Sequence, residues 1–343
     1  MIDNILVVRN DKLGDFVLAW PAFAMLKHSI PSAKITALVP AYTADLARVC
    51  PYIDDVIIDA GKKGDKDEQH KTLSLIRQKR FDVAIAFFSD RYNAVLLWKS
   101  KIPYRLAPAT KIIQFLYNNR LTQRRSKSEK PEFEYNLDLS RYFLTKHRIN
   151  VIEPHYPYLK FKENILQQQR DKLVQMLNIS PQKKWCFIHS GTGGSAKNLT
   201  LNQYAEIATT LLNRFDCQIV LTAGKGESEK ALELQQMIRD RRVVVYDKND
   251  GLVDFAKSIA CCDLFIAGST GPLHLAASLN KAIIGFYPSK RSACALRWKP
   301  INDESKQLLI SANHKESEDT QMSKINIQKV MIEAVPFIER QWA

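Results

Sequence analysis

The sequence lacks the patterns that mark several classes of protein. Its six cysteines are scattered, with no CxxC pair among them, which argues against a zinc site and against a disulfide framework. No apolar run approaches the ~20 residues needed to span a bilayer. The first apolar run, Ile5 to Val8, ends at Arg9 and is too short for the core of a signal peptide. We therefore expect a protein of the reducing cytoplasm, with any membrane contact peripheral.

The chain is long and strongly basic. A length of 343 residues exceeds what a single hydrophobic core usually reaches and favours two α/β domains with separate cores. The net charge of +14 attracts anions such as phosphates, nucleic acid or acidic lipid headgroups. Charge alone does not choose among these partners, so the choice depends on motifs.

Short apolar runs alternate with longer amphipathic stretches in both halves of the chain. This alternation is typical of βαβ units, in which helices cover a parallel sheet. The pattern therefore predicts two Rossmann-like domains. The expected strands are Asn4–Val8, Lys34–Val39, Asp55–Ile58 and Asp82–Phe87 in the first half, and Trp185–His189, Gln218–Thr222, Arg242–Tyr246, Leu264–Ala267 and Ala282–Phe286 in the second.

The two predicted domains meet near residue 165. Residues 152–162 contain two prolines and no helical period, which is typical of an extended crossing segment. Helical spacing resumes at Ile165. We therefore expect a first domain at residues 1–165 and a second at 166–343, which ends in a helix over Ile325–Trp342 despite Pro336.

The loop after the first strand, Arg9 to Asp15, lies where ligands bind in open α/β sheets. Gly14 permits a close backbone turn, and Asp15 stands where the next helix would begin. A carboxylate there caps the helix or takes a proton from a substrate; the local sequence favours capping, because Asp is among the preferred N-cap residues. Pro21 predicts either a bend in this helix or a regular part that starts there.

A second loop, Ser190 to Lys197, follows the first strand of the second half. Its glycines, hydroxyl groups and terminal lysine suit a diphosphate, which backbone N–H groups and one mobile cation can hold. It is not a P-loop, because the GxxxxGK[ST] spacing is missing, and it matches the dinucleotide fingerprint only weakly. Anion binding is favoured over a merely flexible turn because the loop directly follows a strand.

The strongest local signal is the strand-to-helix turn Gly268 to His274. Ser269 or Thr270 is suited to cap the helix, and Pro272 suits its first turn. A helix start reached by small residues is an anion site, and His274 is either a structural histidine or a second contact to that anion. In the turn after Gln218–Thr222, Glu227 is either a ribose-binding carboxylate or a first-turn helix acid.

In combination these segments resemble glycosyltransferase family 9, the ADP-heptose:lipopolysaccharide heptosyltransferases. The resemblance covers essentially the whole chain, and its last motif is the most specific. The segments, in order, are Ile5 to Arg9 with Leu13-Gly14-Asp15, Glu134 to Leu137, His189-Ser190-Gly191 with Lys197, Gly224 to Glu227, and Gly271 to Ala277.

The resemblance implies a GT-B fold, in which two Rossmann-like domains face a cleft, with the acceptor on the first and ADP-heptose on the second. It makes Asp15 the catalytic base, which reverses the local preference for a cap. Many members carry an acid where Ser269 stands, so a donor contact by that carboxylate is not carried over. The diphosphate would be bound by Ser190, Thr192, Lys197, Ser269, Thr270 and Gly271, with His274 in support and Glu227 at the ribose.

Inverting transfer needs a base on the incoming hydroxyl and stabilisation of the charge that grows on the leaving diphosphate. No DxD pair accompanies the loops of the second half, and the resemblance likewise implies a reaction without a metal ion or a separate cofactor. Fixed positive charge of the protein would replace the ion. Which heptose is added is left open by the sequence.

The segment Lys99 to Lys130 contains nine Lys or Arg and one acid, interleaved with apolar residues. This pattern suits an anionic lipid surface, and equally a solvated basic face over ordinary core residues. The acceptor implied by the resemblance, a phosphorylated lipid A and core oligosaccharide at the inner face of the cytoplasmic membrane, favours the first. The cations expected to bind acceptor phosphates are Lys62, Lys63, Lys66, Lys71, Arg124 and Arg125.

Three alternatives differ in class. A GT-B transferase with another nucleotide sugar, such as a UDP-sugar, would share the fold. A nucleotide-dependent oxidoreductase would need its glycine fingerprint after the first strand, where Asn10 to Gly14 stands instead. A nucleic-acid-binding module is suggested by charge alone, without an RNP, zinc or helix-turn-helix signature.

Overall fold

A computed structural model describes residues 2–110, 112–194, 197–312 and 321–343. The chain divides into two compact units, Met1–Tyr158 and Leu159–Ala343. The division falls before the expected residue 165 because the end of the extended segment already belongs to the second unit. There the Leu159 N–H donates to the Ser278 carbonyl over 3.0 Å.

The first unit is built on a six-stranded sheet in which every neighbouring pair is parallel. The strand order is β3-β2-β1-β4-β5-β6. Its central strands are continuous apolar runs that are buried on both faces, as expected when helices cover both sides of a parallel sheet. The strands are β1 (Asn4–Val8), β2 (Lys34–Pro40), β3 (Asp55–Asp59), β4 (Val83–Ala86), β5 (Tyr104–Pro108) and β6 (Asn119–Leu121).

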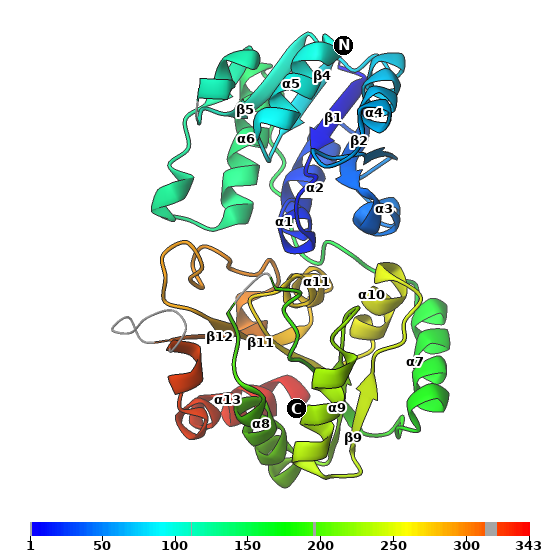
Figure 1. The fold of residues 1–343 in the computed structure, drawn as a ribbon, viewed down its shortest axis with the longest axis vertical. Coiled ribbons are helices and arrows are strands. Elements are labelled where there is room, and N and C mark those ends of the chain that lie inside the picture. Colours follow the sequence, from blue (N-terminus) through cyan, green and yellow to red (C-terminus); the bar gives the residue numbers. More distant parts are fainter. Residues whose placement is uncertain (1, 111, 195–196, 313–320) are drawn as a thin grey trace. The chain divides into compact units, whose positions relative to one another are not determined.

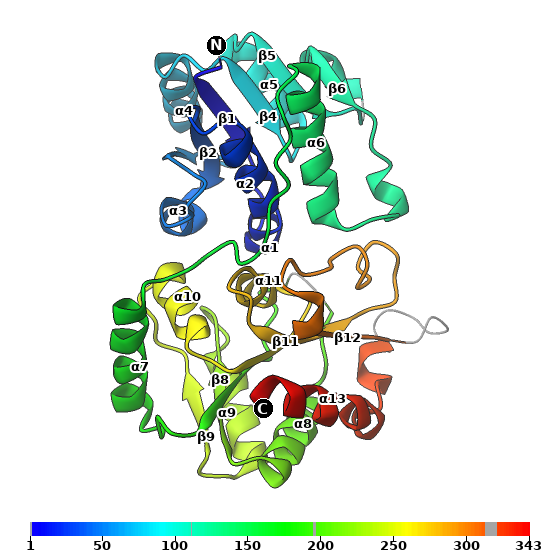
Figure 2. The same ribbon diagram turned by 180° about the vertical axis from the view of Figure 1, so that it is seen from behind.

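Two helical layers cover this sheet. Helices α4 and α5 pack together on the face that is nearer in Figure 1, and α2 and α6 pack together on the face that is nearer in Figure 2. Helix α2 starts at Trp20 with Pro21 in its first turn, so the expected regular start is observed rather than a bend. The helices are α1 (Leu13–Val17), α2 (Trp20–Ser29), α3 (Ala41–Arg48), α4 (Lys66–Gln78), α5 (Arg91–Ser100), α6 (Glu132–Lys146) and the short 3-10 helices η1 (Ile112–Leu116) and η2 (Arg125–Lys127).

The second unit repeats the plan with the parallel order β12-β11-β10-β7-β8-β9. Helices α8, α9 and α13 form one layer and α7, α10 and α11 the other. The strands are β7 (Lys184–His189), β8 (Cys217–Thr222), β9 (Val243–Tyr246), β10 (Leu264–Gly268), β11 (Ala282–Tyr287) and β12 (Gln307–Ser311). The helices are α7 (Glu163–Leu177), α8 (Leu201–Arg214), α9 (Ser228–Ile238), α10 (Leu252–Ala260), α11 (Gly271–Ser278), α13 (Ile327–Trp342) and the 3-10 helices η3 (Glu304–Lys306) and η4 (Met322–Lys324).

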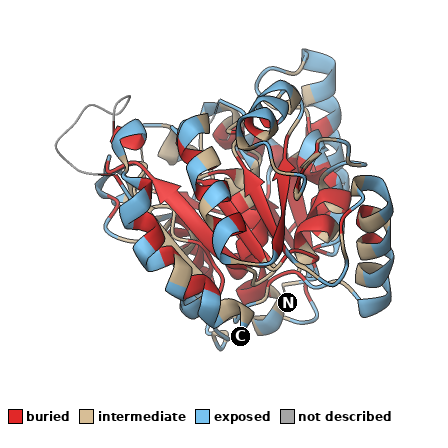
Figure 3. Ribbon diagram, turned by 90° about the horizontal axis from the view of Figure 1, so that it is seen from below, coloured by how far each residue is buried: buried red, intermediate tan, exposed pale blue. Residues whose placement is uncertain are grey.

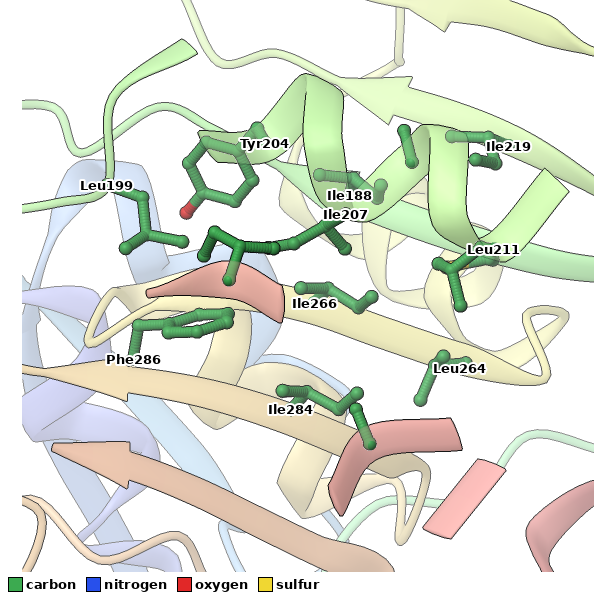
Figure 4. Packing of buried hydrophobic residues seen from close by; sticks show 14 of the residues in the cluster. Ile188, Leu199, Tyr204, Ile207, Leu211, Ile219, Leu264, Ile266, Ile284 and Phe286 are labelled. Carbon is green, nitrogen blue, oxygen red and sulfur yellow. The ribbon is translucent and has the colours of Figure 1, made fainter. Parts of the chain in front are cut away.

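Apolar side chains of the strands and of α8 fill the core of the second unit, as Figure 4 shows for Ile188, Tyr204, Ile207 and Ile266. Figure 3 shows the same division by exposure, with buried strands and with helices exposed on their outer sides. The terminal helix α13 accommodates Pro336 and packs against α8. Burial of these apolar faces holds the strand ends, and hence the loops that follow them, in place.

The nine expected strands are all present, within one or two residues at their ends. Three further strands, β5, β6 and β12, were not predicted from the sequence. β6 and β12 are edge strands, only partly buried, and β5 contains Arg105 and Pro108. β5 and β6 lack the continuous apolar run on which the prediction depends, whereas β12 has only the short run Leu308 to Ile310.

Candidate functional site

Each sheet reverses its strand order at one place, between β1 and β4 in the first unit and between β7 and β10 in the second. In open α/β sheets, ligands bind beyond the carboxyl ends of the strands at such a switch point. The loops after β1, β7 and β10 are the three that the sequence singled out. Each unit therefore has a candidate ligand site of its own.

In the first unit this site is organised by Arg9, whose side chain is only 2% exposed at the end of β1. The guanidinium forms ion pairs with Asp11 over 2.9 Å, Asp15 over 2.6 Å and Glu132 over 3.1 Å. It also donates to the side-chain oxygen of Asn136 over 3.3 Å. A buried arginine thus holds three carboxylates beside the switch point.

Asp15 is not the N-cap of its helix. The N-cap of α1 is Lys12, without a side-chain cap, and Asp15 lies in the first turn with its carboxylate on Arg9. The local expectation of a helix cap is therefore wrong, since an arginine six residues earlier binds the carboxylate instead. Burial raises the pKa of Asp15, Arg9 lowers it and Glu132 raises it, so that the pKa lies above its ordinary value.

The neighbouring Asp11 is perturbed in the same direction. Burial raises its pKa to about 7, against the opposing effect of Arg9, and the charge of Asp15 adds to the rise. Burial therefore outweighs the shared arginine for both carboxylates. Asp11 is suited to accept a proton near neutral pH, and the pKa of Asp15 is raised in the same direction.

Helix α6 supplies the partners that sequence reasoning missed. Glu132 is 2% exposed and accepts from Arg9 over 3.1 Å and from Arg125 over 2.9 Å. Asn136 lies one turn later on the same helix and donates to the Leu18 carbonyl over 3.2 Å. Asn136 belongs to a segment on which the family resemblance rests, but Glu132 has no local signal, because its partner Arg9 is more than a hundred residues away.

In the second unit Glu227 binds two loops together. One carboxylate oxygen accepts from the Gly193 N–H over 2.8 Å, and the other accepts from the Gly224 N–H over 3.0 Å. A Cβ at Gly191 would lie 2.0 Å from the second oxygen, so a side chain at this position would displace the Glu227 carboxylate. His189 lies 3.7 Å away and is itself buried. Glu227 thus sets the shape of the loop after β7 from the start of α9.

Replacing Glu227 with alanine tests this role. Burial raises the pKa of Glu227, but the hydrogen bonds from the N–H groups of Gly193 and Gly224 lower it. The pKa therefore lies below its ordinary value. The stability that the Glu227 carboxylate contributes is therefore fully present above the pKa that Glu227 has in the unfolded chain. It is lost as the pH falls through the pKa of Glu227 in the folded protein. We expect Glu227→Ala to lower the unfolding free energy of the second unit by roughly 1–2 kcal/mol at neutral pH, and by less in acid.

The measurement is urea unfolding at pH 7 and in mild acid. Glu229→Ala is the matched control, because Glu229 lies in the first turn of the same helix but is exposed. Equal midpoints for the two variants at pH 7 would show that the carboxylate does not hold the loops.

Asn198, which the sequence did not indicate, joins the loop after β7 to the end of β10. Its amide donates to the Ser190 carbonyl over 2.9 Å, and its oxygen accepts from the Tyr204 hydroxyl over 2.7 Å. A Cβ at Gly268 would lie 2.4 Å from that oxygen. Thr192 accepts from the Gly194 N–H over 3.2 Å, and Lys197 is exposed. The predicted diphosphate contacts Ser190, Thr192 and Lys197 thus lie on one loop, of which residues 195–196 lie outside the described part.

The start of α11 carries two buried polar atoms without a hydrogen-bond partner. They are the hydroxyl of Thr270, which is the N-cap residue but makes no cap bond, and Nδ1 of His274 in the first turn. Burial lowers the pKa of His274 to about 4, so the imidazole is neutral at pH 7. The Ser269 N–H is used within the fold, since it donates to the Phe286 carbonyl over 3.0 Å. Together with the N–H groups at the first turn of α11, which lack partners inside the helix, the two side-chain atoms can bind an anion by hydrogen bonds.

The expected acceptor cations have different surroundings. Lys62, Lys63 and Arg124 are exposed, whereas Arg125 is half-buried and donates to Glu132 and to the Phe87 carbonyl. Arg125 thus has internal partners. In the basic segment 99–130, Tyr117 belongs to the core, while Ile112 is 87% and Phe115 is 73% exposed. The apolar residues that alternate with basic ones in segment 99–130 therefore include both core and surface side chains.

None of the helices in the described ranges is long and apolar enough to cross a membrane. Within the same ranges, no group of three or more His, Cys, Asp or Glu is arranged to hold a metal ion.

Comparison with known sequences finds relatives of one kind. The profile of glycosyltransferase family 9 (heptosyltransferase) matches residues 70–327. A Haemophilus influenzae protein with the provisional description glycosyltransferase is 55% identical over 341 residues, which is 99% of this chain and 98% of that protein. Lipopolysaccharide heptosyltransferase 2 of Salmonella typhimurium is 20% identical over 294 residues, which is 83% of this chain and 82% of that protein.

Solved structures share the fold. ADP-heptose lipopolysaccharide heptosyltransferase II of Escherichia coli matches with a TM-score of 0.80 over 99% of this chain and 100% of that one, at 19% identity. An E. coli heptosyltransferase solved with ADP matches with a TM-score of 0.74 over 97% of this chain and 99% of that one, at 17% identity. With two parallel six-stranded sheets, the expected GT-B fold is confirmed.

Proposed function

The chain belongs to glycosyltransferase family 9, the heptosyltransferase family, and on this basis we propose that it transfers a heptose from ADP-heptose to a hydroxyl of the lipopolysaccharide inner core. Membership decides against the oxidoreductase and the nucleic-acid-binding module. The observation that supports the specific proposal is that each unit, taken by itself, has at its switch point one kind of group that the reaction needs. The first unit offers a carboxylate of raised pKa, and the second offers buried, unpartnered polar atoms at a helix start.

Asp15 is the proposed base. Its raised pKa brings the carboxylate closer to the working pH, which favours removal of a proton from the acceptor hydroxyl as that oxygen attacks the sugar. Arg9 holds the carboxylate through a 2.6 Å ion pair and so limits its orientations. Attack by the deprotonated oxygen on the face opposite the leaving diphosphate gives inversion.

The diphosphate is the proposed ligand of the helix start at Thr270 and Gly271. The Thr270 hydroxyl and a neutral His274 N–H can donate to its oxygens, with Lys197, Ser190, Thr192 and Ser269 around it. We propose that these fixed dipoles and the lysine stabilise the leaving group without a metal ion. Glu227 keeps acceptor capacity beyond its two backbone bonds, which supports a contact with the ribose hydroxyls.

The acceptor is the proposed partner of the first unit. The exposed side chains of Lys62, Lys63 and Arg124 are suited to bind the acceptor's phosphates. Arg125, next to Arg124 in the chain, adds a half-buried cation. We propose that the enzyme works in the cytoplasm, peripherally at the inner face of the cytoplasmic membrane. The net charge of +14 supports attraction to anionic lipid.

The test is transfer with purified protein and truncated lipopolysaccharide acceptors. We expect one acceptor to gain the mass of a heptose from ADP-heptose, and ADP to bind more tightly than UDP. Transfer from a UDP-sugar with no reaction from ADP-heptose would instead establish the GT-B alternative that uses another nucleotide sugar. Inclusion of a chelator tests the metal-independent step, since activity should persist.

A further inference from the structure

The segment after β11, residues 288–300, has no part in the reaction proposed above. Because β10 and β11 are parallel neighbours, this segment leaves the sheet at the same edge as the turn into α11. The hydrogen bond from the Ser269 N–H to the Phe286 carbonyl ties the two turns together at that edge. The segment therefore begins beside the anion site proposed at the start of α11 (Figure 1).

Trp298, near the end of this segment, contacts the imidazole of His274. The centroids of the two rings lie 6.4 Å apart, and their planes meet at 50°. Aromatic rings at such a separation attract one another beyond the effect of the area that they bury. Since His274 lies in the first turn of α11, the contact joins the segment after β11 to the start of that helix.

Trp298 is held from two sides. Within the segment its Nε1 donates to the Ser292 carbonyl over 2.9 Å, and its N–H donates to the Cys294 carbonyl over 3.1 Å. From the end of β11 the hydroxyl of the buried Tyr287 donates to the Trp298 carbonyl over 3.3 Å. The indole is therefore a fixed surface against which another side chain can be oriented.

The imidazole of His274 needs such a surface. The side chain is 2% exposed, and its Nδ1 is buried without a hydrogen-bond partner among the described residues. A half-turn of the ring would put the carbon Cδ2 in the place of Nδ1, and no hydrogen bond at Nδ1 opposes that turn. The orientation of the ring therefore depends on the side chains that pack against it, of which Trp298 is one.

We propose that Trp298 is a positioning residue for the bound diphosphate. Its indole fixes the plane of the His274 imidazole and covers it from water, so that Nδ1 meets the diphosphate in one orientation. Packing that locks the conformation of a ligand-binding side chain strengthens binding, because less freedom is lost when the ligand arrives. The inference rests on the proposed function, since it takes the anion at the start of α11 to be the diphosphate of the donor.

The test compares Trp298→Leu with Trp298→Phe in the full-length protein. Both variants lose the Nε1 bond to Ser292, but only phenylalanine keeps a ring beside His274, so their difference isolates the ring contact. Trp298→Met replaces the leucine variant if that variant does not fold. Trp342→Leu is the control, because Trp342 packs against Phe215 on the terminal helix of the same unit. The probes are ADP, UDP and inorganic pyrophosphate, followed by calorimetry.

We expect Trp298→Leu to weaken binding of ADP and pyrophosphate by about fivefold, and Trp298→Phe and Trp342→Leu by less than about twofold. In a His274→Ala background, Trp298→Leu should cost less than about twofold, because the side chain through which it acts is gone. The pKa of His274, followed by NMR of the imidazole, should rise toward its ordinary value in Trp298→Leu, since burial is what lowers it.

Three results would overturn the role of Trp298. An equal loss with and without His274 would mean that Trp298 acts by another route, and equal losses in the leucine and phenylalanine variants would assign the effect to the Nε1 bond. Unchanged binding in Trp298→Leu would remove the role altogether. Binding of UDP and pyrophosphate without ADP would refute only the proposed donor, because those probes still test Trp298. Wild-type protein that binds none of the three would refute both proposals.

Discussion

Replacement of Asp15 by asparagine is expected to abolish most sugar transfer while ADP affinity stays within about twofold of the wild type. A positioned general base contributes roughly 10²–10⁴-fold to a rate, and asparagine keeps the shape of the side chain but cannot take the proton. The nucleotide is unaffected because its proposed ligands belong to the other unit. Single-turnover transfer and ADP titration measure the two effects.

Asp11→Asn is the matched control for this prediction. Asp11 shares Arg9 with Asp15 and has a raised pKa as well, so its loss perturbs the same cluster without removing the proposed base. We expect a smaller loss of turnover for Asp11→Asn. A larger loss at Asp11 than at Asp15, or substantial turnover by Asp15→Asn, would assign the proton transfer to another group.

Replacement of Glu132 by glutamine is expected to have the largest effect on stability. Glu132 is buried between Arg9 and Arg125, and its neutralisation leaves both guanidinium groups short of a counter-charge. Breaking a buried ion pair from one side typically costs about 3–5 kcal/mol. Because Arg125 is partly exposed and Arg9 keeps two carboxylates, the lower end of that range is expected. Thermal or urea unfolding measures the loss.

The same variant separates positioning from mere support of the fold. Burial is the main cause that raises the pKa of Asp15, and the charge of Glu132 raises it further. Without that charge the pKa of Asp15 falls, so the acid limb of kcat/KM should move to lower pH. Glu134→Gln is the control: Glu134 lies on the same helix and pairs with Arg141 at a partly exposed position. An acid limb that stays in place for Glu132→Gln would leave Glu132 only a structural role.

Several elements follow from local sequence because the physical cause is local. A strand buried on both faces must be a continuous apolar run, as in Leu264 to Ala267, and a helix that begins at a glycine-rich turn leaves its N–H groups free. This is why the turns at Ser190, Glu227 and Thr270 were recognised. An edge strand such as β6 buries little of its surface, so the three residues of β6 show no continuous apolar run.

The sequence by itself determined two parallel α/β units and the turns that follow their central strands, because burial of strands and the chemistry of turns depend on neighbouring residues. Only the tertiary structure decided what those loops contain. Arg9 meets Glu132 because α6 packs against α2 and β5. Glu227 reaches Gly193 across two loops. Such contacts depend on folding, which brings together charges that are far apart in the chain.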